Sequence, residues 1–448
     1  MSHLAMRELA RRMVERAQAK GANLSEAYGL DAKELSIDVS KGIVETMKLA
    51  EDRGIGIRLF QGGKMGYSYT SDLSEKALEE TVDRALANAR WNAEDRFRGL
   101  PGKADRYPDV KTYDPSLAVV SVEQKIELAK AIEAAAKAVD GRIKIIERSS
   151  YTDTEYTVTI INSQGVDVAC RGAYCGGYAY LVAEENGESQ TGFSLSYGLS
   201  FDGIDPEQIG REAAEKALRM LGAKPVSSRR APVVFDPYVA TQFLAILAPS
   251  LTAEAVQKGK SLFAGKEGQP IAAPEVTVID DGRMEGRILS APFDGEGVPT
   301  SRTVLIDKGT LAGYLHNTYT AAKAGAVSTG NGSRGSFRGT PEVGTTNFYL
   351  QAGNCAPGEL IGQIESGFYV TEVMGMHTAN PISGDFSVGA AGLLIEQGRL
   401  TRPVRGVALA GNLLDWLQGI DGVGSDLTFF IGKGAPTLRV KEMAISGP

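Results

Sequence analysis

The chain has 448 residues, of which 43% are hydrophobic and 23% are charged. This length exceeds that of most single domains and the composition is typical of a globular protein, so we expect two domains with buried cores. The net charge of −7 and the lack of any cluster of basic residues argue against direct binding to nucleic acid.

The first predicted unit consists of a helix, antiparallel strands and a second helix. Apolar residues at helical spacing predict an amphipathic helix over residues 4–20. Polar and apolar residues alternate from 25 to 71, with a turn at Gln61-Gly62-Gly63, which indicates antiparallel strands. Asp72 or Ser74 then caps the second helix.

A second unit repeats this order. Ser121-Val122-Glu123-Gln124 is a capping box that begins a helix with a periodic apolar face. Three strand-like runs follow between residues 143 and 203. Asp205 then caps another helix, with Pro206 at its first position. The two units share the order of their elements but not their amino-acid residues, and this recurrence indicates an internal duplication.

The main domain boundary is predicted in a linker. Residues 222–232 are rich in Pro and Ser, and after them come a short strand, an apolar helix (TQFLAILAPSL), and mostly strands with Gly-rich turns. We place an N-terminal domain at 1–225 and a C-terminal domain at 226–448. The predicted fold class is α+β, with helices on antiparallel sheets in the first domain and a mostly β, curled or barrel-like second domain.

The cysteines and the N-terminal segment bear on localisation. Cys170, Cys175 and Cys355 are odd in number and include no CxxC pair, which argues against a disulfide framework. Cys170 and Cys175 fall on predicted strands, where we expect them to pack. The N-terminal segment lacks the apolar core of a signal peptide, and no stretch has the apolar length of a membrane span. We expect a cytoplasmic protein with no membrane partner.

Few histidines are available for chemistry. His3 lies at the start, His316 follows a predicted strand, and His377 lies in the loop VMGMHTANPISGDFS. No two lie within a helical turn and there is no HExxH motif, so there are few ways to assemble a zinc site. His377 is either a polar loop residue bonded to nearby backbone or a catalytic residue.

One pair of carboxylates admits two interpretations. Asp294 and Glu296 lie two residues apart in the Gly-rich stretch SAPFDGEGVPTSRT. They are either a general acid/base pair or groups that cap turns and hold the backbone near Arg302. Asp280-Asp281-Gly282 ends a strand and predicts a turn. No GxSxG elbow signals a serine nucleophile.

The stretch from Ser328 to Gly344, STGNGSRGSFRGTPEVG, is a Gly-rich loop that contains Arg334 and Arg338. It matches no phosphate-loop spacing. It is either a mobile surface loop or a lid whose arginines meet a peptide carboxylate or backbone. With few apolar anchors before Gly339, we expect it to be more mobile than the strands around it.

The second half resembles a known family. Five long motifs occur in the order found in TldD/PmbA proteins, also called peptidase U62 or modulators of DNA gyrase. They are FAGKEGQPIAAPEVTVIDDG, APFDGEGVPTSRTVLIDKGTLAGYL, STGNGSRGSFRGTP, SGDFSVGAAGLLIEQGRLTRPVRGVALAGNL and GAPTLRVKEM. The similarity is strong from about Phe263 onward and weaker in the first half.

The resemblance implies which kind of subunit this is. TldD-type chains carry an HExxxH zinc motif on a helix and a cysteine ligand near the C-terminus. By this resemblance the two histidines fall on about Leu244 and Pro249, the glutamate on about Ala245, and the cysteine within Thr428–Gly432. None of these positions has ligand or acid chemistry. The chain therefore resembles the PmbA/TldE type, with no catalytic or metal-binding residues of its own.

The resemblance also implies a role and a partner. It predicts a non-catalytic subunit of a metallopeptidase that cleaves or matures unfolded peptides, paired with a zinc-bearing TldD-type subunit or with itself. Two alternatives stand beside it: a stand-alone hydrolase that uses Asp294 or Glu296 with His377, and a peptide-binding scaffold without proteolytic activity. Whether the chain is itself an enzyme is left open.

Two sets of residues follow from this interpretation. We expect the loop around His377 and the arginines of the Gly-rich loop to shape a peptide cavity. The predicted substrate-binding residues are His377, Thr378, Asn380, Asp385, Arg334 and Arg338. For contact with a second subunit the candidates are Met374, Met376, Leu414 and Trp416, with Trp416 equally suited to the domain core.

Overall fold

The computed structural model describes residues 3–448, with side chains from Ala5 onward. The N-terminal part contains α1 (His3–Ala19), β1 (Leu24–Ser40), β2 (Ile43–Gln61), β3 (Lys64–Thr70), α2 (Glu75–Trp91), α3 (Val122–Val139), β4 (Ile143–Asn162), β5 (Asp167–Glu185), β6 (Glu188–Gly198) and α4 (Pro206–Leu218). Short 3-10 turns η1 (Pro115–Val119) and η2 (Phe201–Gly203) connect some of these. The boundary expected at residue 225 falls between α4 and the next strand.

The C-terminal part contains more and shorter elements. Its helices are α5 (Pro237–Leu247), η3 (Ala248–Leu251), α6 (Ala253–Gln257), α7 (Thr318–Ala324), α8 (Pro357–Gly362), η4 (Met376–Thr378) and α9 (Leu413–Gly419). Its strands are β7 (Arg229–Phe235), β8 (Val278–Asp281), β9 (Arg302–Asp307), β10 (Thr310–Leu311), β11 (Gly332–Ser333), β12 (Glu342–Val343), β13 (Phe348–Leu350), β14 (Ser366–Met374), β15 (Asp385–Glu396), β16 (Arg399–Asn412), β17 (Ile420–Val423), β18 (Thr428–Phe430), β19 (Lys433–Ala435) and β20 (Leu438–Ser446).

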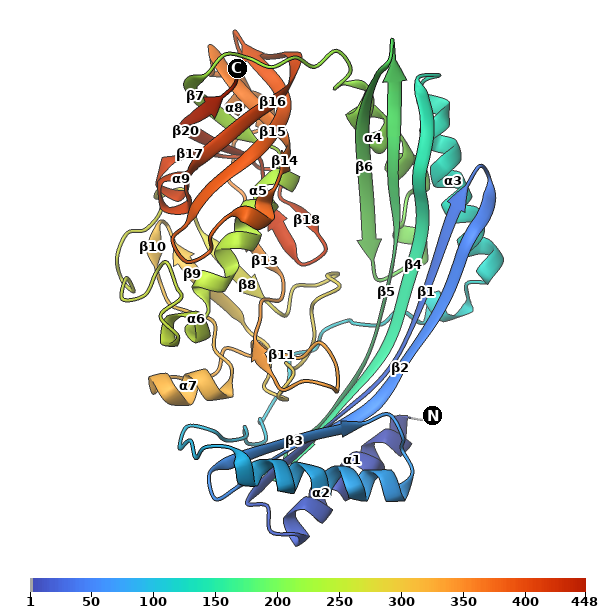
Figure 1. Cartoon of the computed structure of the whole chain (residues 1–448), viewed down its shortest axis with the longest axis vertical. Coiled ribbons are helices and arrows are strands. Elements are labelled where there is room, and N and C mark those ends of the chain that lie inside the picture. Colours follow the sequence, from blue (N-terminus) through green and yellow to red (C-terminus); the bar gives the residue numbers. More distant parts are fainter. Residues whose placement is uncertain (1–2) are drawn as a thin grey trace.

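One antiparallel sheet supports the N-terminal part. Its strand order is β3-β2-β1-β4-β5-β6, so the two helix–strands–helix units meet where β1 of the first pairs with β4 of the second. That pair is long, from Glu26 opposite Asn162 to Val39 opposite Ser149. Helices α1 and α2 cover one end of the sheet and α3 and α4 the other, each pair over its own apolar cluster (Figure 1).

Local sequence sets where these helices begin. Ser74, and not Asp72, caps α2 by accepting the N–H of Ala77. Ser121 forms the expected capping box at the start of α3, and Asp205 caps α4 with Pro206 in its first turn. Because a cap bonds only to residues two or three positions away, these predictions needed no tertiary information, and they are confirmed.

Two glycines let helices lie directly on the sheet. A Cβ at Gly66 of β3 would come within 1.9 Å of the carbonyl oxygen of Ala85 in α2. A Cβ at Gly192 of β6 would come within 2.1 Å of the carbonyl oxygen of Ala213 in α4. The two units therefore use the same close contact between the outermost strand and the second helix.

The C-terminal part is mostly β, as expected, and the α+β class is confirmed. Strands β16, β15, β14, β7 and β20 follow one another, and the additional β16–β20 pairing closes them into a barrel. A second sheet has the order β10-β9-β8-β13-β19-β18. Phe243 of α5 stacks on Trp416 with ring centroids 5.1 Å apart, and Trp416 is 2% exposed. Trp416 is thus a core residue, which is the second of the two roles predicted for it.

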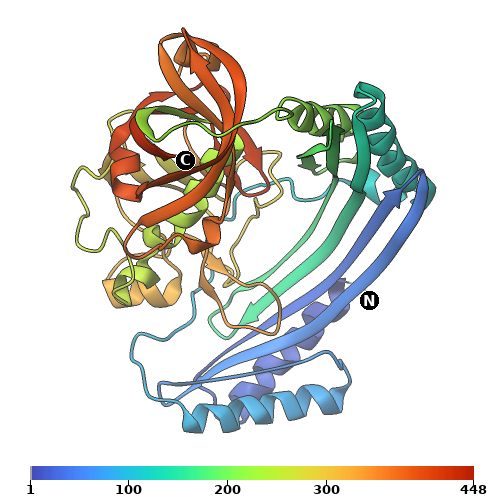
Figure 2. The same cartoon turned by 45° about the horizontal axis from the view of Figure 1, so that its top comes forward.

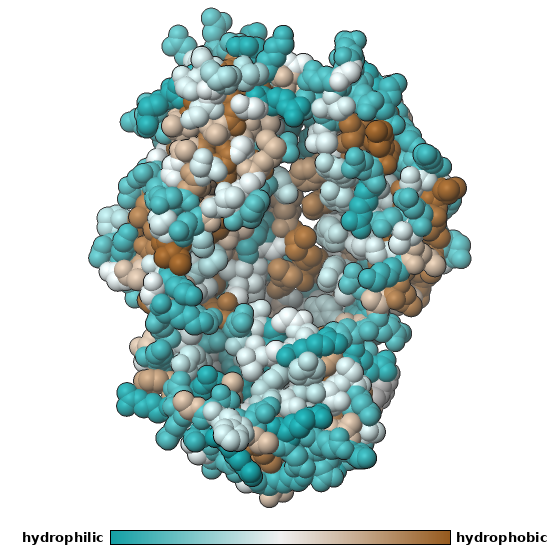
Figure 3. All heavy atoms as spheres, viewed as in Figure 1, coloured by the Kyte–Doolittle hydropathy of each residue, from teal (hydrophilic) through white to brown (hydrophobic). Residues whose placement is uncertain are grey.

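The two parts enclose an open space. The long strands curve past the C-terminal part (Figure 2), and the surface between the two is hollowed, with hydrophobic residues at its bottom (Figure 3). One hollow of about 560 Å³ separates α4 and β6 from residues 427–431. Within residues 3–448, no helix is both long and apolar enough to cross a membrane.

Substituting either close-packed glycine tests this packing. We expect Gly66→Ala and Gly192→Ala each to lower the free energy of unfolding by roughly 1–3 kcal/mol, because the added methyl group meets helix backbone that cannot rotate away. Gly141→Ala is the matched control, since its Cβ would meet nothing within 4 Å. Urea unfolding followed by circular dichroism measures the difference. Equal midpoints for all three variants would contradict the packing.

Candidate functional site

A pocket of about 580 Å³ opens in the C-terminal part, and we call it the lysine pocket. Its walls come from the end of α5, from η3 and α6, from residues 342–345 and from Pro381 and Ile382. Lys258, Lys260 and Lys433 supply its positive charge, and Glu254 and Glu342 its negative charge. Most other lining groups are apolar or small.

Lys433 connects this pocket to a buried carboxylate. Its Nζ donates to Thr345 Oγ1 at 2.5 Å and lies 5.3 Å from the ring centre of Phe348. Burial lowers the pKa of Lys433, and the charge of nearby Asp280 opposes this only in part. None of the described side-chain carboxylates forms an ion pair with it.

Asp280 accepts hydrogen bonds on both of its carboxylate oxygens. Asn331 Nδ2, Thr346 N and Thr346 Oγ1 bond to its two oxygens at 2.7 to 2.8 Å. Burial raises the pKa of Asp280, while these hydrogen bonds favour its ionised form. The predicted turn at 280–282 is therefore also a buried polar centre, which fastens residues 331 and 346 to strand β8.

A second centre joins the two parts of the chain, and we call it the junction. Arg58 Nη2 lies 3.0 Å from Glu26 Oε2 and 3.0 Å from Glu296 Oε1. Glu26 and Arg58 are direct partners across β1 and β2, whereas Glu296 belongs to the C-terminal part. All three side chains are 6% exposed or less. The other oxygen of Glu296 accepts the N–H of Thr318 at the start of α7.

Asp294 holds a turn beside this junction. Its Oδ1 accepts the N–H groups of Glu296 and Val298, and its Oδ2 accepts that of Gly332 at 2.7 Å. Burial, together with the charge of Glu296, raises the pKa of Asp294 to about 7. Of the two interpretations for Asp294 and Glu296, the geometry matches turn formation for Asp294, which holds Gly332 and not Arg302. Glu296 instead holds Arg58 and the N–H of Thr318.

The Gly-rich loop is fastened to the sheet, so the expectation of few anchors was wrong, while its mobility relative to the neighbouring strands stays a prediction. Phe337 is fully buried in a cluster with Tyr28, and its carbonyl accepts the Tyr67 hydroxyl at 2.5 Å. Arg334 is buried and ion-paired to Glu26. Arg338 is exposed and bidentate to Asp52, at 2.7 and 2.8 Å. Both arginines are thus paired with acids of the N-terminal sheet.

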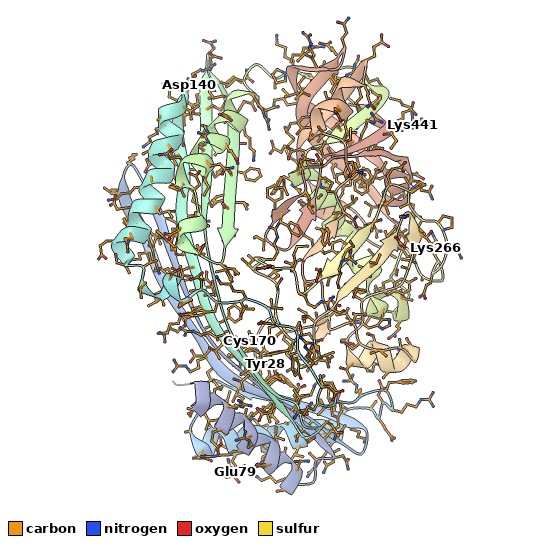
Figure 4. The ribbon with its side chains drawn as sticks, turned by 180° about the vertical axis from the view of Figure 1, so that it is seen from behind. Tyr28, Glu79, Asp140, Cys170, Lys266 and Lys441 are labelled. Carbon is orange, nitrogen blue, oxygen red and sulfur yellow. The ribbon has the colours of Figure 1, made fainter. Side chains whose placement is uncertain are left out.

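Beside the junction lies a second, smaller pocket of about 330 Å³, the junction pocket. Tyr28, Cys170 and Arg334 line it, and it shares Gly344 and Thr345 with the lysine pocket. Figure 4 shows Tyr28 and Cys170 where the long strands pass the C-terminal part. Residues 344–345 therefore form a partition between two neighbouring cavities.

The loop between β14 and β15 contains the other four predicted residues. Asn380 Oδ1 accepts the N–H groups of Ile382 and Ser383, and Thr378 Oγ1 donates to the carbonyl of Gly375. Asp385 accepts from Asn412 Nδ2 at 2.9 Å. His377 is exposed. This loop reaches the lysine pocket only through Pro381 and Ile382.

The predicted residues therefore do not meet in one place. Arg334 and Arg338 lie at the sheet, whereas His377, Thr378, Asn380 and Asp385 form a turn on the C-terminal part. His377 is exposed while Asp294 and Glu296 are buried at the junction, so the catalytic combination of these three is not assembled. The substrate-binding role of the six residues stays a prediction.

The positions implied for a zinc motif do not suit a metal. Leu244 is fully buried in the domain core, and Ala245 and Pro249 line the lysine pocket with apolar groups. Across the described part of the chain, no three His, Cys, Asp or Glu side chains come together in a way that could hold a metal ion. The donor set at this helix end does not fit zinc.

Three domain models of one family match consecutive parts of the chain. They are PmbA/TldA metallopeptidase domain 1 over residues 25–89, the central domain over 115–221 and the C-terminal domain over 228–447. The chain belongs to the PmbA/TldD family. The predicted family is confirmed, and its domain limits bracket the linker between α4 and β7.

Relatives in this family extend over nearly the whole chain. Metalloprotease PmbA from Escherichia coli O157:H7 is 29% identical, over 98% of this chain and 97% of its own length. A metalloprotease from Methanothermobacter thermautotrophicus is 30% identical, over 92% and 93%. A crystal structure from Thermotoga maritima, described as a modulator of a DNA gyrase, superimposes with a TM-score of 0.91 at 29% identity, covering 98% of this chain and 99% of that one. TldE from Thermococcus kodakarensis shares the fold, with a TM-score of 0.90 at 22% identity over 98% of this chain and 100% of that one.

For this member of the PmbA/TldD family, the sequence did not predict the buried charged groups at the junction, at Asp280 or at Lys433. Glu26 and Arg58 lie in ordinary alternating strands, and nothing local distinguishes them from solvated charges. The burial of Asp280 could have been predicted, because this acid directly follows the apolar run VTVI. The burial of Lys433 could also have been predicted, because it lies between two glycines next to apolar residues.

Asp294 makes stability depend on pH in a predictable direction. Its folded pKa is raised from 3.8 to about 7, so the folded state retains its proton where the unfolded chain loses it. The stability it contributes is present at low pH and is lost as pH rises through the folded value. Relative to Asp294→Asn, we expect the wild type to lose on the order of 2–3 kcal/mol between pH 5 and pH 8.

Urea unfolding of both proteins at the two pH values measures this. Other titrating groups are common to the two proteins, so their effects cancel in the comparison. Any loss of stability caused by the Asn side chain itself is the same at both pH values and also cancels. A difference between wild type and variant that does not change with pH would refute the raised pKa.

Proposed function

We propose that this chain is the metal-free, PmbA/TldE-type subunit of a TldD/TldE-type metallopeptidase complex that cleaves or matures unfolded peptides. The observation that carries the proposal is the end of α5. Leu244, Ala245 and Pro249 stand where the family resemblance puts metal and acid groups, yet a pocket of about 580 Å³ is retained there. A pocket whose described lining offers no set of metal ligands suits binding and shaping better than metal-assisted bond cleavage.

An unpaired sheet edge supports association with a second chain. Strand β3 pairs only with residues 55–61 of β2, and no other described strand pairs with the outer edge of β2 before that. Ile43, Met47 and Leu49 on this stretch are 68%, 56% and 66% exposed. Exposed apolar edges of this kind are sites of chain association. Met374, 47% exposed, is a further candidate contact.

In this proposal the partner supplies zinc and the chemistry, and both chains work in the cytoplasm. The present chain contributes cavity walls and places the peptide. Without the zinc subunit it pairs with itself, because related subunits tend to keep a common two-fold contact. No direct contact with nucleic acid or a membrane is part of the proposal.

Co-expression with an HExxxH paralogue from the same genome tests the proposal. We expect a stable complex by light scattering, and cleavage of an unstructured peptide only when both chains are present. Chelation or replacement of the paralogue's motif glutamate abolishes cleavage, and elemental analysis finds no stoichiometric zinc in the isolated chain.

Other outcomes distinguish the alternatives. Chelator-insensitive cleavage by the isolated chain would make it a stand-alone hydrolase. A chain that binds peptide but neither pairs with the paralogue nor contributes to cleavage would be a scaffold. Either result would reject the partner-subunit role.

A further inference from the structure

The lysine pocket contains a lysine, Lys433, that forms no ion pair with any of the described carboxylates. Lys433 has three N–H donors and the structure gives one of them a partner, Thr345 Oγ1. The nearest buried acid, Asp280, already accepts hydrogen bonds on both oxygens from Asn331 and Thr346. The ring of Phe348, 5.3 Å away, and the charge of Asp280 offset part of the cost of removing this ammonium group from water, but no carboxylate contacts it directly.

The other described charges of the pocket form no ion pair with Lys433. Lys258 is ion-paired to Glu254 at 2.5 Å, and Glu342 acts on Lys258 as well. Lys260 is exposed at the rim and has no ion pair among the described side chains. Acidic side chains therefore neutralise the charge of Lys258, whereas Lys433 and Lys260 remain available to bind an anionic ligand.

The walls restrict what kind of anion fits. Ala245, Pro249, Val343 and Ile382 surround the lysines with apolar surface, and the volume of about 580 Å³ is suited to one or two amino-acid residues. Thr345 accepts from Lys433, and its own hydroxyl proton remains available to donate. An apolar side chain next to a carboxylate matches this combination better than a polyanion does.

We propose that the lysine pocket binds a carboxylate of a peptide, with Lys433 as the ion-pair partner, Thr345 as a hydrogen-bond donor and Lys260 as a second cation at the rim. The inference rests on the proposed peptide-handling function and names the ligand group of this pocket. The carboxylate comes from the C-terminus of the peptide or from an Asp or Glu side chain. The same pocket accepts either source.

Binding to a half-buried lysine has a consequence that an exposed lysine would not show. Burial lowers the pKa of free Lys433, and a bound carboxylate raises it again by stabilising the ammonium form. Carboxylate binding at alkaline pH is therefore coupled to proton uptake by Lys433. Affinity falls at alkaline pH, starting at a lower pH than for a solvated lysine.

Fluorescence anisotropy with the full chain tests the proposal. The probes are three N-terminally labelled, unstructured peptides of Gly, Ser and Leu: one with a free C-terminus, one amidated, and one amidated with an internal Glu. We expect the free acid to bind wild type about tenfold or more tightly than the plain amide, the size of a charge-assisted hydrogen bond. The internal Glu peptide shows whether a side-chain carboxylate also enters.

Substitutions of lysines in the pocket test whether the preference for the free-acid peptide over the amide arises there. Lys433→Met removes the charge at similar volume and is expected to abolish the acid-over-amide preference, while Lys433→Arg retains much of it. Lys260→Gln, at an exposed position, reduces it without threatening the fold. Lys441→Met is the matched control, because Lys441 is exposed on β20 and lines a different hollow.

The outcomes separate this inference from the proposed function. If acid and amide bind wild type equally, the carboxylate site is overturned while peptide binding stands. If the preference survives in both Lys433→Met and Lys260→Gln, the carboxylate binds elsewhere and the assignment is wrong. If no peptide binds the wild-type chain, the peptide-handling function fails together with the inference.

Discussion

The arrangement of the two parts depends on one guanidinium group. Arg58 lies between a carboxylate of its own sheet, Glu26, and one of the C-terminal part, Glu296, and all three are buried. Arg334 adds a second cation on Glu26, so the four charges balance. Burial raises the pKa of Asp294 first of all, and the neighbouring charge of Glu296 raises it further, because ionised Asp294 would add a negative charge to this balanced set. Removing any one member would leave a buried charge unpaired, the most costly kind of loss in such a network.

This junction also determines the shape of the pockets. Arg334 and Phe337 hold the Gly-rich loop against the sheet, and Asp294 holds Gly332 in the same loop. The chain then returns through β12 to Thr345, which lies between the junction pocket and the lysine pocket. A loop that composition alone marks as mobile is thus the wall between two cavities, and its position is fixed by contacts with residues about 300 positions away.

The distance over which a residue acts explains what could be predicted from the sequence. The caps at Ser121 and Asp205 depend on neighbours within one turn, and the alternation of the strands is local as well, so helices, strands and the α+β class followed from pattern. The family followed from long motifs that survive in one order. The burial of Phe337 and the Glu26–Arg58–Glu296 contact depend on how two separately folded parts meet, and no local pattern contains that information. For the same reason Trp416 could be assigned either to an interface or to a core, and only the stacking on Phe243 decides it.

The pocket at the end of α5 does not depend on metal-ligand side chains at Leu244, Ala245 and Pro249. The walls of the lysine pocket come from η3, α6, residues 342–345 and the turn at Pro381 and Ile382, each held by its own contacts. Ser250 Oγ bonds to the carbonyl of Pro381, and Thr252 caps α6. Leu244 contributes to the core instead of the cavity, so an apolar residue there stabilises the fold. The walls of the cavity therefore do not depend on metal-ligand side chains at this helix end, and Lys433, its cation without an ion pair on the sheet side, comes from strand β19.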